Sequence, residues 1–326
     1  MSFKVGSTRD LLKANGEPAF TPDAFDEFDR NPDIEWEWIA EDVREITPDI
    51  AARYDAIHVN EPKVTAESIA RDDCRVKIFA RAGVGFDSVD VAACAAKGIL
   101  VTNTPYAIRR PVAVAALTLI FALAGRLIIK DRLVREGRWM ERTAHMGDGL
   151  TGRILGLIGA GGIGQDLIPL ARPFFQEIVV ADPFVDETVL EGLGARKCSL
   201  DEVLATADFV TAACPLNAKT HHLMGADAFA AMRRDAYFIN VARGPVHDEA
   251  ALIHALQSGD IAGAALDVTE VEPLDPTSPL TSMENVILTP HSLCWTDECF
   301  EDIARTALRS IVDVSLGNRP QHVVEG

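Results

Sequence analysis

The sequence alternates short runs of β-branched and other apolar residues with longer stretches of helical periodicity. Nine such runs are YDAIHV (54–59), RVKIFA (75–80), GILVTN (98–103), RILGLIG (153–159), EIVVAD (177–182), DFVTAA (208–213), AYFINV (236–241), GAALDV (263–268) and NVILTP (285–290). Strands that alternate with helices form βαβ units, whose strands are parallel. The sequence therefore predicts an α/β fold with doubly wound parallel sheets.

The length of the chain indicates two domains. A single hydrophobic core stops growing at roughly 250 to 300 residues, and this chain has 326. Its formal net charge of −18 would repel a nucleic-acid backbone or an anionic lipid surface. The first residues lack the apolar core of a signal peptide, and no apolar run reaches the roughly 18 to 20 residues of a membrane span. We expect a cytoplasmic protein that binds neither nucleic acid nor membrane.

The six cysteines show no paired CxxC spacing. They are too few for a disulfide scaffold in a chain of this length, so reduced thiols are expected. Cys294 and Cys299 lie close together in the sequence, but a zinc site would need two further well-placed ligands. We expect no metal site.

A glycine-rich motif follows the fourth of these runs. Gly159, Gly161 and Gly164 have GxGxxG spacing between a predicted strand and a predicted helix. In a dinucleotide-binding loop, the first glycine makes a tight turn, the second lets the backbone approach a pyrophosphate, and the third lets the helix pack on the strand. Asp182 ends the next predicted strand, where a carboxylate accepts hydrogen bonds from ribose hydroxyls and repels the extra phosphate of NADP. The motif predicts an NAD site.

Three residues suited to acid–base or anion chemistry follow the last three predicted strands: Arg243, Glu272 and His291. The carboxyl ends of parallel strands meet at one edge of the sheet, so we expect these side chains near the nucleotide loop. Oxidation of an alcohol needs a base for the hydroxyl proton and the reverse reaction needs an acid, and His291 suits both. Glu272 would favour the imidazolium, and Arg243 can bind a carboxylate and the adjacent carbonyl.

Other candidate bases are weaker. His221 and His222 lie in a polar loop, where a surface or cofactor-edge position is expected. His145 and His247 are expected to be solvated or capping. The sequence has no GxSxG elbow, which excludes a serine-nucleophile interpretation.

Two long helices are expected. The segment from Pro111 to Arg135 is predicted as one long helix that bridges two domains or two subunits, and Thr296 to Leu316 as a second, amphipathic helix. Ser199 begins a predicted capping box, and Gly98 and Gly259 are predicted to end helices.

Taken together, these motifs resemble the D-isomer-specific 2-hydroxyacid dehydrogenases, a family that includes phosphoglycerate, glycerate and D-lactate dehydrogenases. The similarity covers most of the chain. It rests on RAGVGFDSVD (81–90), GILVTNTP (98–105), GLIGAGGIG (156–164), INVARGPVHDEAAL (239–252), SGDIAGAALDV (258–268), Glu272-Pro273 and NVILTPH (285–291), which occur in the family's order.

The resemblance implies a Rossmann NAD-binding domain, residues 105–292, inserted into a discontinuous flavodoxin-like substrate domain made of residues 1–104 and 293–326. It also implies a homodimer through the helix that begins near Pro111. The implied reaction is hydride transfer between NAD(H) and a small, anionic D-2-hydroxy acid or 2-oxo acid. In this reaction His291 is the acid/base, Glu272 its carboxylate partner, and Arg243 the substrate anchor.

The resemblance also implies further binding residues. The expected cofactor-binding residues are Gly159, Gly161, Gly162, Ile163, Gly164, Asp182, Cys214, Pro215, Thr220, Val241, Ala242 and Asp267. The substrate-binding residues that the resemblance implies are Ala82, Gly83, Val84, Gly85 and Arg243. Arg81 is a further expected anion contact because it immediately precedes the glycine-rich turn, and Trp295 is expected to wall the pocket.

The chain departs from the family pattern at several positions. Val114 replaces the usual acid, Arg109 and Arg110 add charge, and Trp295 brings a bulky indole after His291. These changes point to an unusual substrate. Two alternatives stay open: an NAD(H)-responsive, corepressor-like binding protein, and an oxidoreductase acting on another small anion such as phosphite.

Overall fold

The computed structural model describes residues 2–325, and the chain divides into two compact units. Unit 1 comprises Met1–Ile108 and Trp295–Gly326, and unit 2 comprises Arg109–Cys294. The chain therefore leaves unit 1, forms unit 2 and returns, and it crosses between the units a few residues after the predicted domain boundaries. Each unit is described by itself.

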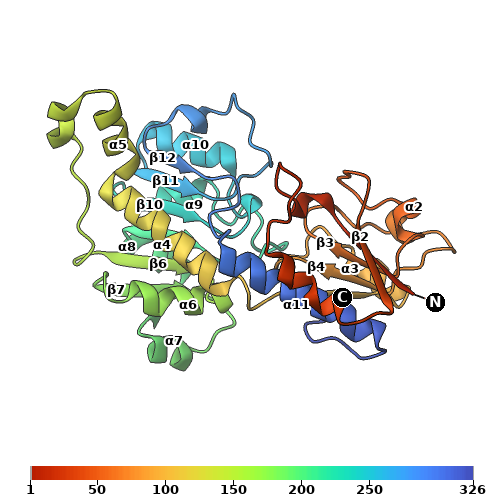
Figure 1. Ribbon diagram of the computed structural model, residues 1–326. Helices are drawn as coiled ribbons and strands as arrows, with labels where there is room; N and C mark the ends of the chain where they lie inside the picture. Colours follow the sequence, from red (N-terminus) through yellow and green to blue (C-terminus); the bar gives the residue numbers. More distant parts are fainter. Residues whose placement is uncertain (1, 326) are drawn as a thin grey trace. The chain divides into compact units, whose positions relative to one another are not determined.

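Unit 1 is built on a five-stranded parallel sheet with the strand order β2-β1-β3-β4-β5. Figure 1 labels β2, β3 and β4 of this sheet. The strands are β1 (Phe3–Ser7), β2 (Ile34–Trp38), β3 (Ala56–Val59), β4 (Ile78–Arg81) and β5 (Leu100–Thr102). This is the flavodoxin-like order, and it confirms the predicted fold class for this part of the chain.

Helices cover both faces of this sheet. One core joins apolar side chains of β1, β3 and β4 to α1 (Asp26–Asp29) and α11 (Asp297–Ser315). A second core, with other side chains of β3 and β4, includes residues of α2 (Pro48–Ala51) and α3 (Val91–Ala96). The predicted C-terminal helix is confirmed as α11. The Thr296 side chain caps its start by accepting a hydrogen bond from the backbone N–H of Cys299.

Unit 2 contains a seven-stranded parallel sheet with the strand order β12-β11-β10-β9-β6-β7-β8. The strands are β6 (Ile154–Ile158), β7 (Glu177–Ala181), β8 (Arg196–Lys197), β9 (Phe209–Ala212), β10 (Tyr237–Asn240), β11 (Gly263–Leu266) and β12 (Val286–Leu288). The chain runs outward from β6 in one direction and restarts at β9 in the other. This is the Rossmann order with one added strand, and the order reverses between β6 and β9.

Two layers of helices enclose the sheet of unit 2 (Figure 1). The helix α6 (Gly162–Ala171) packs between α4 (Arg109–Gly125) and α7 (Glu187–Leu193). The opposite layer contains α8 (Leu200–Thr206), α9 (Ala226–Ala231) and α10 (Glu249–Ser258). Ser199 caps α8 as predicted, while the carboxylate of Glu202, the other residue of the predicted capping box, accepts from Arg196. The predicted helix ends are confirmed, because both Gly98 and Gly259 have the left-handed conformation there.

The prediction of one long helix from Pro111 to Arg135 is wrong. The segment forms α4 and α5 (Leu127–Arg135), which are bent by 59° at Arg126. Arg126 has a left-handed backbone with φ of 49°, which stops the α4 hydrogen-bond ladder directly after Gly125. Within residues 2–325 no single helix is long and apolar enough to cross a bilayer, and α4 and α5 pass that test only as a bent pair.

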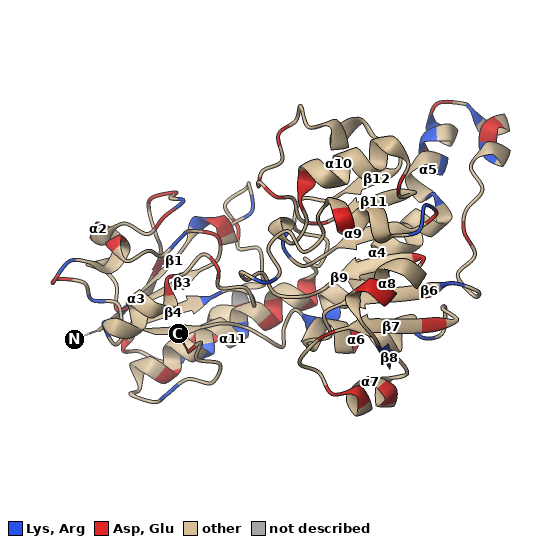
Figure 2. Cartoon of the chain, turned by 180° about the vertical axis from the view of Figure 1, so that it is seen from behind, with Lys and Arg blue, Asp and Glu red and all other residues tan. Residues whose placement is uncertain are grey.

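The helix α5 and the 3-10 segment Trp139–Ala144 project from the rest of unit 2 before the chain returns to β6 (Figure 1). Lys and Arg residues gather on α5 (Figure 2).

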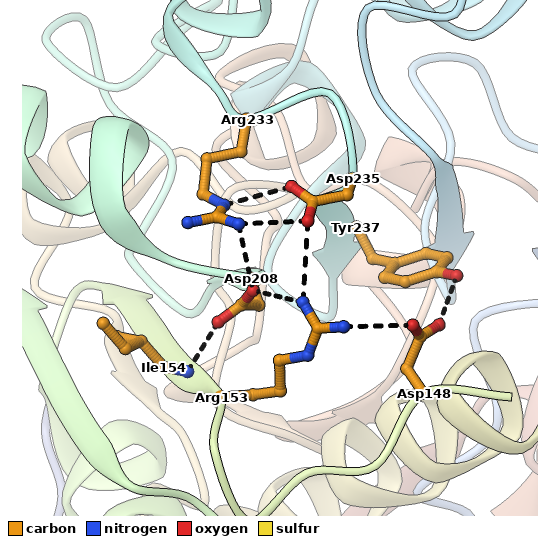
Figure 3. Close-up of polar contacts among 7 residues, drawn as sticks. All are labelled: Asp148, Arg153, Ile154, Asp208, Arg233, Asp235 and Tyr237. Atoms are coloured by element: carbon orange, nitrogen blue, oxygen red, sulfur yellow. Dashed lines mark hydrogen bonds and ion pairs between the residues drawn. The ribbon is translucent and has the colours of Figure 1, made fainter.

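A polar network connects the segment that leads into β6 to the amino ends of the central strands of unit 2 (Figure 3). Arg153 precedes β6 and bonds to Asp208 at 2.8 Å and to Asp148 at 3.3 Å. Asp208, which is 5% exposed, also accepts from the backbone N–H of Ile154. Asp148 in turn accepts a 2.9 Å hydrogen bond from the hydroxyl of Tyr237. The network lies at the edge of the sheet opposite the carboxyl ends.

Candidate active site

The glycine loop lies where the strand order of unit 2 reverses. Gly159 follows β6 with φ of +93°, and a Cβ at this position would lie 2.8 Å from the backbone of Cys214, which follows β9. A Cβ at Gly164 would lie 2.7 Å from the carbonyl oxygen of Gly159. Both glycines are therefore needed for close approach of the backbone, as the motif predicts.

Gly161 has a different environment. It is the N-cap residue of α6, and no atom lies within 4 Å of its would-be Cβ. No side chain caps α6 at this end, and its first turn carries no acidic residue. Open space in front of the N–H groups of a helix N-terminus suits a phosphate group, so the loop fits the pyrophosphate of a dinucleotide.

Asp182 lies at the end of β7 and accepts three backbone hydrogen bonds. Its carboxylate accepts from the N–H groups of Ala160 at 2.7 Å, Phe184 at 2.8 Å and Val185 at 3.0 Å. Partial burial would raise the pKa of this carboxyl, but the three N–H groups outweigh it and hold the pKa below its usual value. An ionised carboxylate has about four acceptor positions, so capacity remains for a ribose hydroxyl.

The other predicted cofactor residues of unit 2 follow β6, β9 and β10. Ile163 lies in the first turn of α6, and Val241 and Ala242 are buried directly after β10. Cys214 is buried, which raises the pKa of its thiol to about 11. Thr220 donates to the carbonyl of Pro215 at 2.6 Å and closes the loop after β9. The structure brings these residues to the carboxyl edge of one sheet.

His291 and Glu272 form a direct pair. Nδ1 of His291 lies 2.9 Å from Oε2 of Glu272, and the other carboxylate oxygen accepts from the N–H of Thr269 at 3.2 Å. Partial burial would raise the pKa of Glu272, but the hydrogen bond from His291, that histidine's charge, the Thr269 N–H and the charge of Arg243 together lower it. Glu272 therefore stays ionised, and Nδ1 of His291 donates to it.

The backbone of His291 is held by Asp267 at the end of β11. The N–H of His291 donates to the carbonyl of Asp267 at 2.8 Å. The Asp267 carboxylate accepts from the Thr289 hydroxyl at 2.6 Å and from the N–H groups of Ser292 and Leu293, both at 3.2 Å. His291 has φ of 53°, a left-handed backbone conformation that residues other than glycine rarely adopt. The hydrogen bonds to Asp267 hold the backbone in this conformation.

Arg243 depends on a buried asparagine that the sequence analysis did not single out. Asn240 ends β10 fully buried, donates to the carbonyl of Arg243 at 2.9 Å and accepts from the N–H of Ala242 at 2.9 Å. The amide thus shapes the turn that presents Arg243. A polar residue at the end of an otherwise apolar strand is the signal that could have found it.

The predicted substrate residues other than Arg243 lie in unit 1. The Arg81 guanidinium donates to the carbonyl of Ala82 at 2.5 Å and lies against Gly83, which has φ of +132°. The Gly83 carbonyl accepts from the N–H of Thr104, and the Val84 carbonyl from the Asn103 side chain. Gly85 belongs to the same turn. Trp295 is half-exposed and meets Phe300 edge to face.

The other histidines differ from the expectation in one case. His247 is fully buried, not solvated, and its Nδ1 lies 3.0 Å from the Asn240 amide. Burial lowers its pKa to about 4. His222 pairs with Glu270 at 2.7 Å and stacks on His221, in the loop after β9. Among residues 2–325, no group of three or more potential ligands could hold a metal ion.

Comparisons with known proteins agree with this geometry. Residues 117–292 match the family profile described as D-isomer specific 2-hydroxyacid dehydrogenase, NAD binding domain. A glyoxylate reductase of Korarchaeum cryptofilum is 36% identical over 253 residues, which cover 77% of this chain and 76% of the relative. A D-3-phosphoglycerate dehydrogenase of Archaeoglobus fulgidus is 36% identical over 81% of this chain. The match spans only half the length of the latter protein, 50%.

Solved structures share the whole fold. A Thermus thermophilus protein superimposes with a TM-score of 0.86 at 30% identity, over 99% of this chain and 100% of that one. The D-lactate dehydrogenase of Aquifex aeolicus, solved with NAD and lactic acid, gives a TM-score of 0.84 at 26% identity over 96% of both chains. With its glycine loop, its strand orders and these matches, the chain belongs to the family of D-isomer specific 2-hydroxyacid dehydrogenases, with an NAD-binding Rossmann domain.

Proposed function

We propose that the protein transfers a hydride between NAD(H) and the hydroxyl-bearing carbon of a small D-2-hydroxy acid. The observation that carries the proposal is the His291–Glu272 pair, which follows β12 and β11 at the sheet edge that holds the glycine loop. NAD, when bound, supplies or accepts the hydride. The protein must then handle the proton of the substrate oxygen and hold the carboxylate.

His291 is the proposed acid and base. Because its Nδ1 donates to Glu272, Nε2 is the ring nitrogen that exchanges a proton with the substrate oxygen. In the oxidation direction Nε2 takes the hydroxyl proton, and in the reduction direction it returns a proton to the oxygen as negative charge develops there. The ionised Glu272 stabilises the imidazolium in both directions.

Arg243 is the proposed substrate anchor. Its positively charged guanidinium offers a fork of donors that matches a carboxylate and the neighbouring oxygen. Its charge also contributes to the lowered pKa of Glu272, which places it in the electrostatic environment of the His291–Glu272 pair.

Unit 1 is the proposed substrate domain. The carbonyls of Ala82, Gly83 and Val84 are already engaged by groups of unit 1. This fixes the turn. The N–H of Ala82 donates to the carbonyl of Val59 at 2.8 Å, which corrects the expectation that Ala82 binds the substrate carboxylate. We propose that the N–H groups of Gly83, Val84 and Gly85 bind this carboxylate, with Arg81 and Trp295 as further substrate contacts. The names of the relatives, glyoxylate reductase and D-3-phosphoglycerate dehydrogenase, support small 2-oxo and 2-hydroxy acids as the substrate class.

The test is NADH consumption with glyoxylate, hydroxypyruvate, pyruvate, phenylpyruvate and oxaloacetate. We expect turnover of at least one acid, loss of both substrate capture and turnover in Arg243→Ala, and loss of turnover by about 10²- to 10⁴-fold in a His291 variant. His291→Asn is the preferred variant, because asparagine tolerates the left-handed backbone at this position. Full activity in folded His291→Asn would overturn the mechanism. No NADH consumption with any of the five acids would overturn the proposed substrate class.

We also propose a cytoplasmic homodimer formed through α4 and α5. Half of the exposed large apolar residues of the described chain lie in α4, α5 and the segment that follows them: Val114, Phe121, Leu127, Ile128, Val134, Trp139, Met140 and Met146. This concentration of exposed apolar residues in one stretch of the chain supports a protein–protein interface. None of the six cysteines forms a disulfide, which fits a reducing compartment.

Light scattering tests the dimer. Leu127→Glu is expected to give monomers, whereas Val189→Glu, the same charge on an exposed apolar position of α7, leaves the dimer intact. A wild-type monomer, or a dimer unaffected by Leu127→Glu, would contradict the proposed interface.

A further inference from the structure

We infer that Arg109 is a pyrophosphate-binding residue of the NAD site, which it reaches from a helix outside the glycine loop. The inference rests on the dinucleotide site described above. Arg109 is one of the residues by which the sequence departs from the family pattern, and the inference gives its positive charge a role.

The geometry joins the first residues of two helices. Arg109 opens α4, and Gly162 is the first residue of α6. A Cβ built on Gly162 would lie 2.3 Å from Nε of Arg109 and 2.7 Å from its Cδ and Cζ. The arginine side chain therefore lies directly against the α-carbon of the residue at which α6 begins. Because α4 and α6 pack against each other within unit 2, the backbone of Arg109 lies beside the start of α6.

This pair explains a glycine that the motif does not require. The GxGxxG spacing is satisfied by Gly159, Gly161 and Gly164, and position 162 is free to carry a side chain. Here a side chain would occupy the space of the Arg109 guanidinium. The absence of a Cβ at Gly162 thus lets a cation from α4 reach the start of α6.

The electrostatics indicate an anion as the partner. The N-terminus of a helix carries a partial positive charge, so it opposes a guanidinium placed beside it. No acidic residue lies in the first turn of α6, and no side chain caps this end. A pyrophosphate bound here would accept hydrogen bonds from the N–H groups of the helix end and from the guanidinium together. The open side of Gly161 provides the space.

The first test is calorimetric binding of NADH and of ADP-ribose to the whole protein, without substrate. Arg109→Gln is expected to lower the affinity for both ligands by about ten-fold, the effect of losing a charge-assisted hydrogen bond. It is also expected to reduce the salt dependence of binding, and to leave binding of adenosine, which has no phosphate, unchanged. Arg110→Gln is the matched control, because it removes the same charge from the adjacent, exposed residue.

The second test uses Gly162. Gly162→Ala is expected to displace the guanidinium and to weaken NADH as Arg109→Gln does, whereas the double variant is no weaker than Arg109→Gln alone. Equal NADH affinity in Arg109→Gln and Arg110→Gln would overturn the inference, as would losses that add in the double variant. Failure of the wild-type protein to bind NADH would instead overturn the proposed function.

Discussion

Oε2 of Glu272 lies 2.9 Å from Nδ1 of His291, so the negative charge of one stabilises the positive charge of the other. Glu272→Gln keeps an oxygen at hydrogen-bond distance but removes the charge. We expect kcat for 2-oxo acid reduction to decline at a lower pH than in wild-type protein, because no neighbouring negative charge then stabilises the proton that passes to the substrate oxygen. The pH profile of kcat measures this.

Glu270→Gln is the control for Glu272→Gln. Glu270 lies two positions before Glu272 and pairs with a different histidine, His222, at 2.7 Å. If the profile moves equally in both variants, the effect belongs to the general charge of this loop and the proposed pairing role of Glu272 is wrong.

Asp182 is expected to act on both cofactor choice and stability. Asp182→Ala leaves the N–H groups of Ala160, Phe184 and Val185 without their acceptor, which costs about 1 to 3 kcal/mol of the free energy of unfolding. Removing the charge also weakens discrimination against NADPH. Urea unfolding and the ratio of NADH to NADPH affinity measure the two effects. An unchanged ratio would exclude Asp182 from cofactor selection.

The direction of the Asp182 pKa gives a pH window. The pKa in the folded protein is lowered, so the contribution of this carboxylate to stability is present above its ordinary pKa of 3.8 and is lost as the pH falls through the lower folded value. In wild-type protein Asp182 therefore contributes to acid unfolding only below about pH 4.

The sequence predicted the NAD-binding half of the fold better than the other half. All nine predicted strands exist, and most of their β-branched runs are buried, although β12 is only partly buried. The strands β1, β2 and β8 were missed. The sequence of β2, IEWEW, alternates apolar and acidic residues, so it lacks the continuous apolar run of the predicted strands. The strand β8 has only two residues. Their pairing depends on distant neighbours, which a local pattern does not contain.

Two local features could not be predicted from the sequence pattern, the break between α4 and α5 and the burial of His247. Arg126 carries no signal for a left-handed residue, so the break between α4 and α5 was not predicted. His247 lies in a polar stretch of sequence, yet tertiary packing against Phe238 buries it. By contrast, the His291–Glu272 pair could be anticipated, because both residues follow neighbouring parallel strands and so end at the same sheet edge.

Buried histidines predict a loss of stability in mild acid. Burial lowers the pKa of His247 and of His58 to about 4, from 6.5. Stability from each neutral ring is fully present above pH 6.5 and is lost as the pH falls towards 4, because only the unfolded chain takes up the proton. The loss approaches roughly 3 kcal/mol per histidine.

His247→Gln tests this expectation. Glutamine can keep a hydrogen bond with Asn240 but does not titrate in this range. The urea midpoint of the variant should fall less steeply than that of wild-type protein between pH 6.5 and about 4. Parallel curves would show that His247 takes up no extra proton on unfolding.

The network around Asp208 predicts a loss of stability that spares catalysis. Asp208→Ala removes the acceptor of the Ile154 N–H and of the Arg153 guanidinium (Figure 3). Its side chain is only 7% exposed, so we expect a loss of about 2 to 4 kcal/mol in the free energy of unfolding. Asp235→Ala, whose side chain is 57% exposed and bonds to Arg233, should cost less than about 1 kcal/mol. Because both residues precede strands whose opposite ends carry the site, folded protein of either variant should keep the wild-type kcat. A fall in kcat for Asp208→Ala at a temperature where it is fully folded would mean that the two ends of the sheet are coupled.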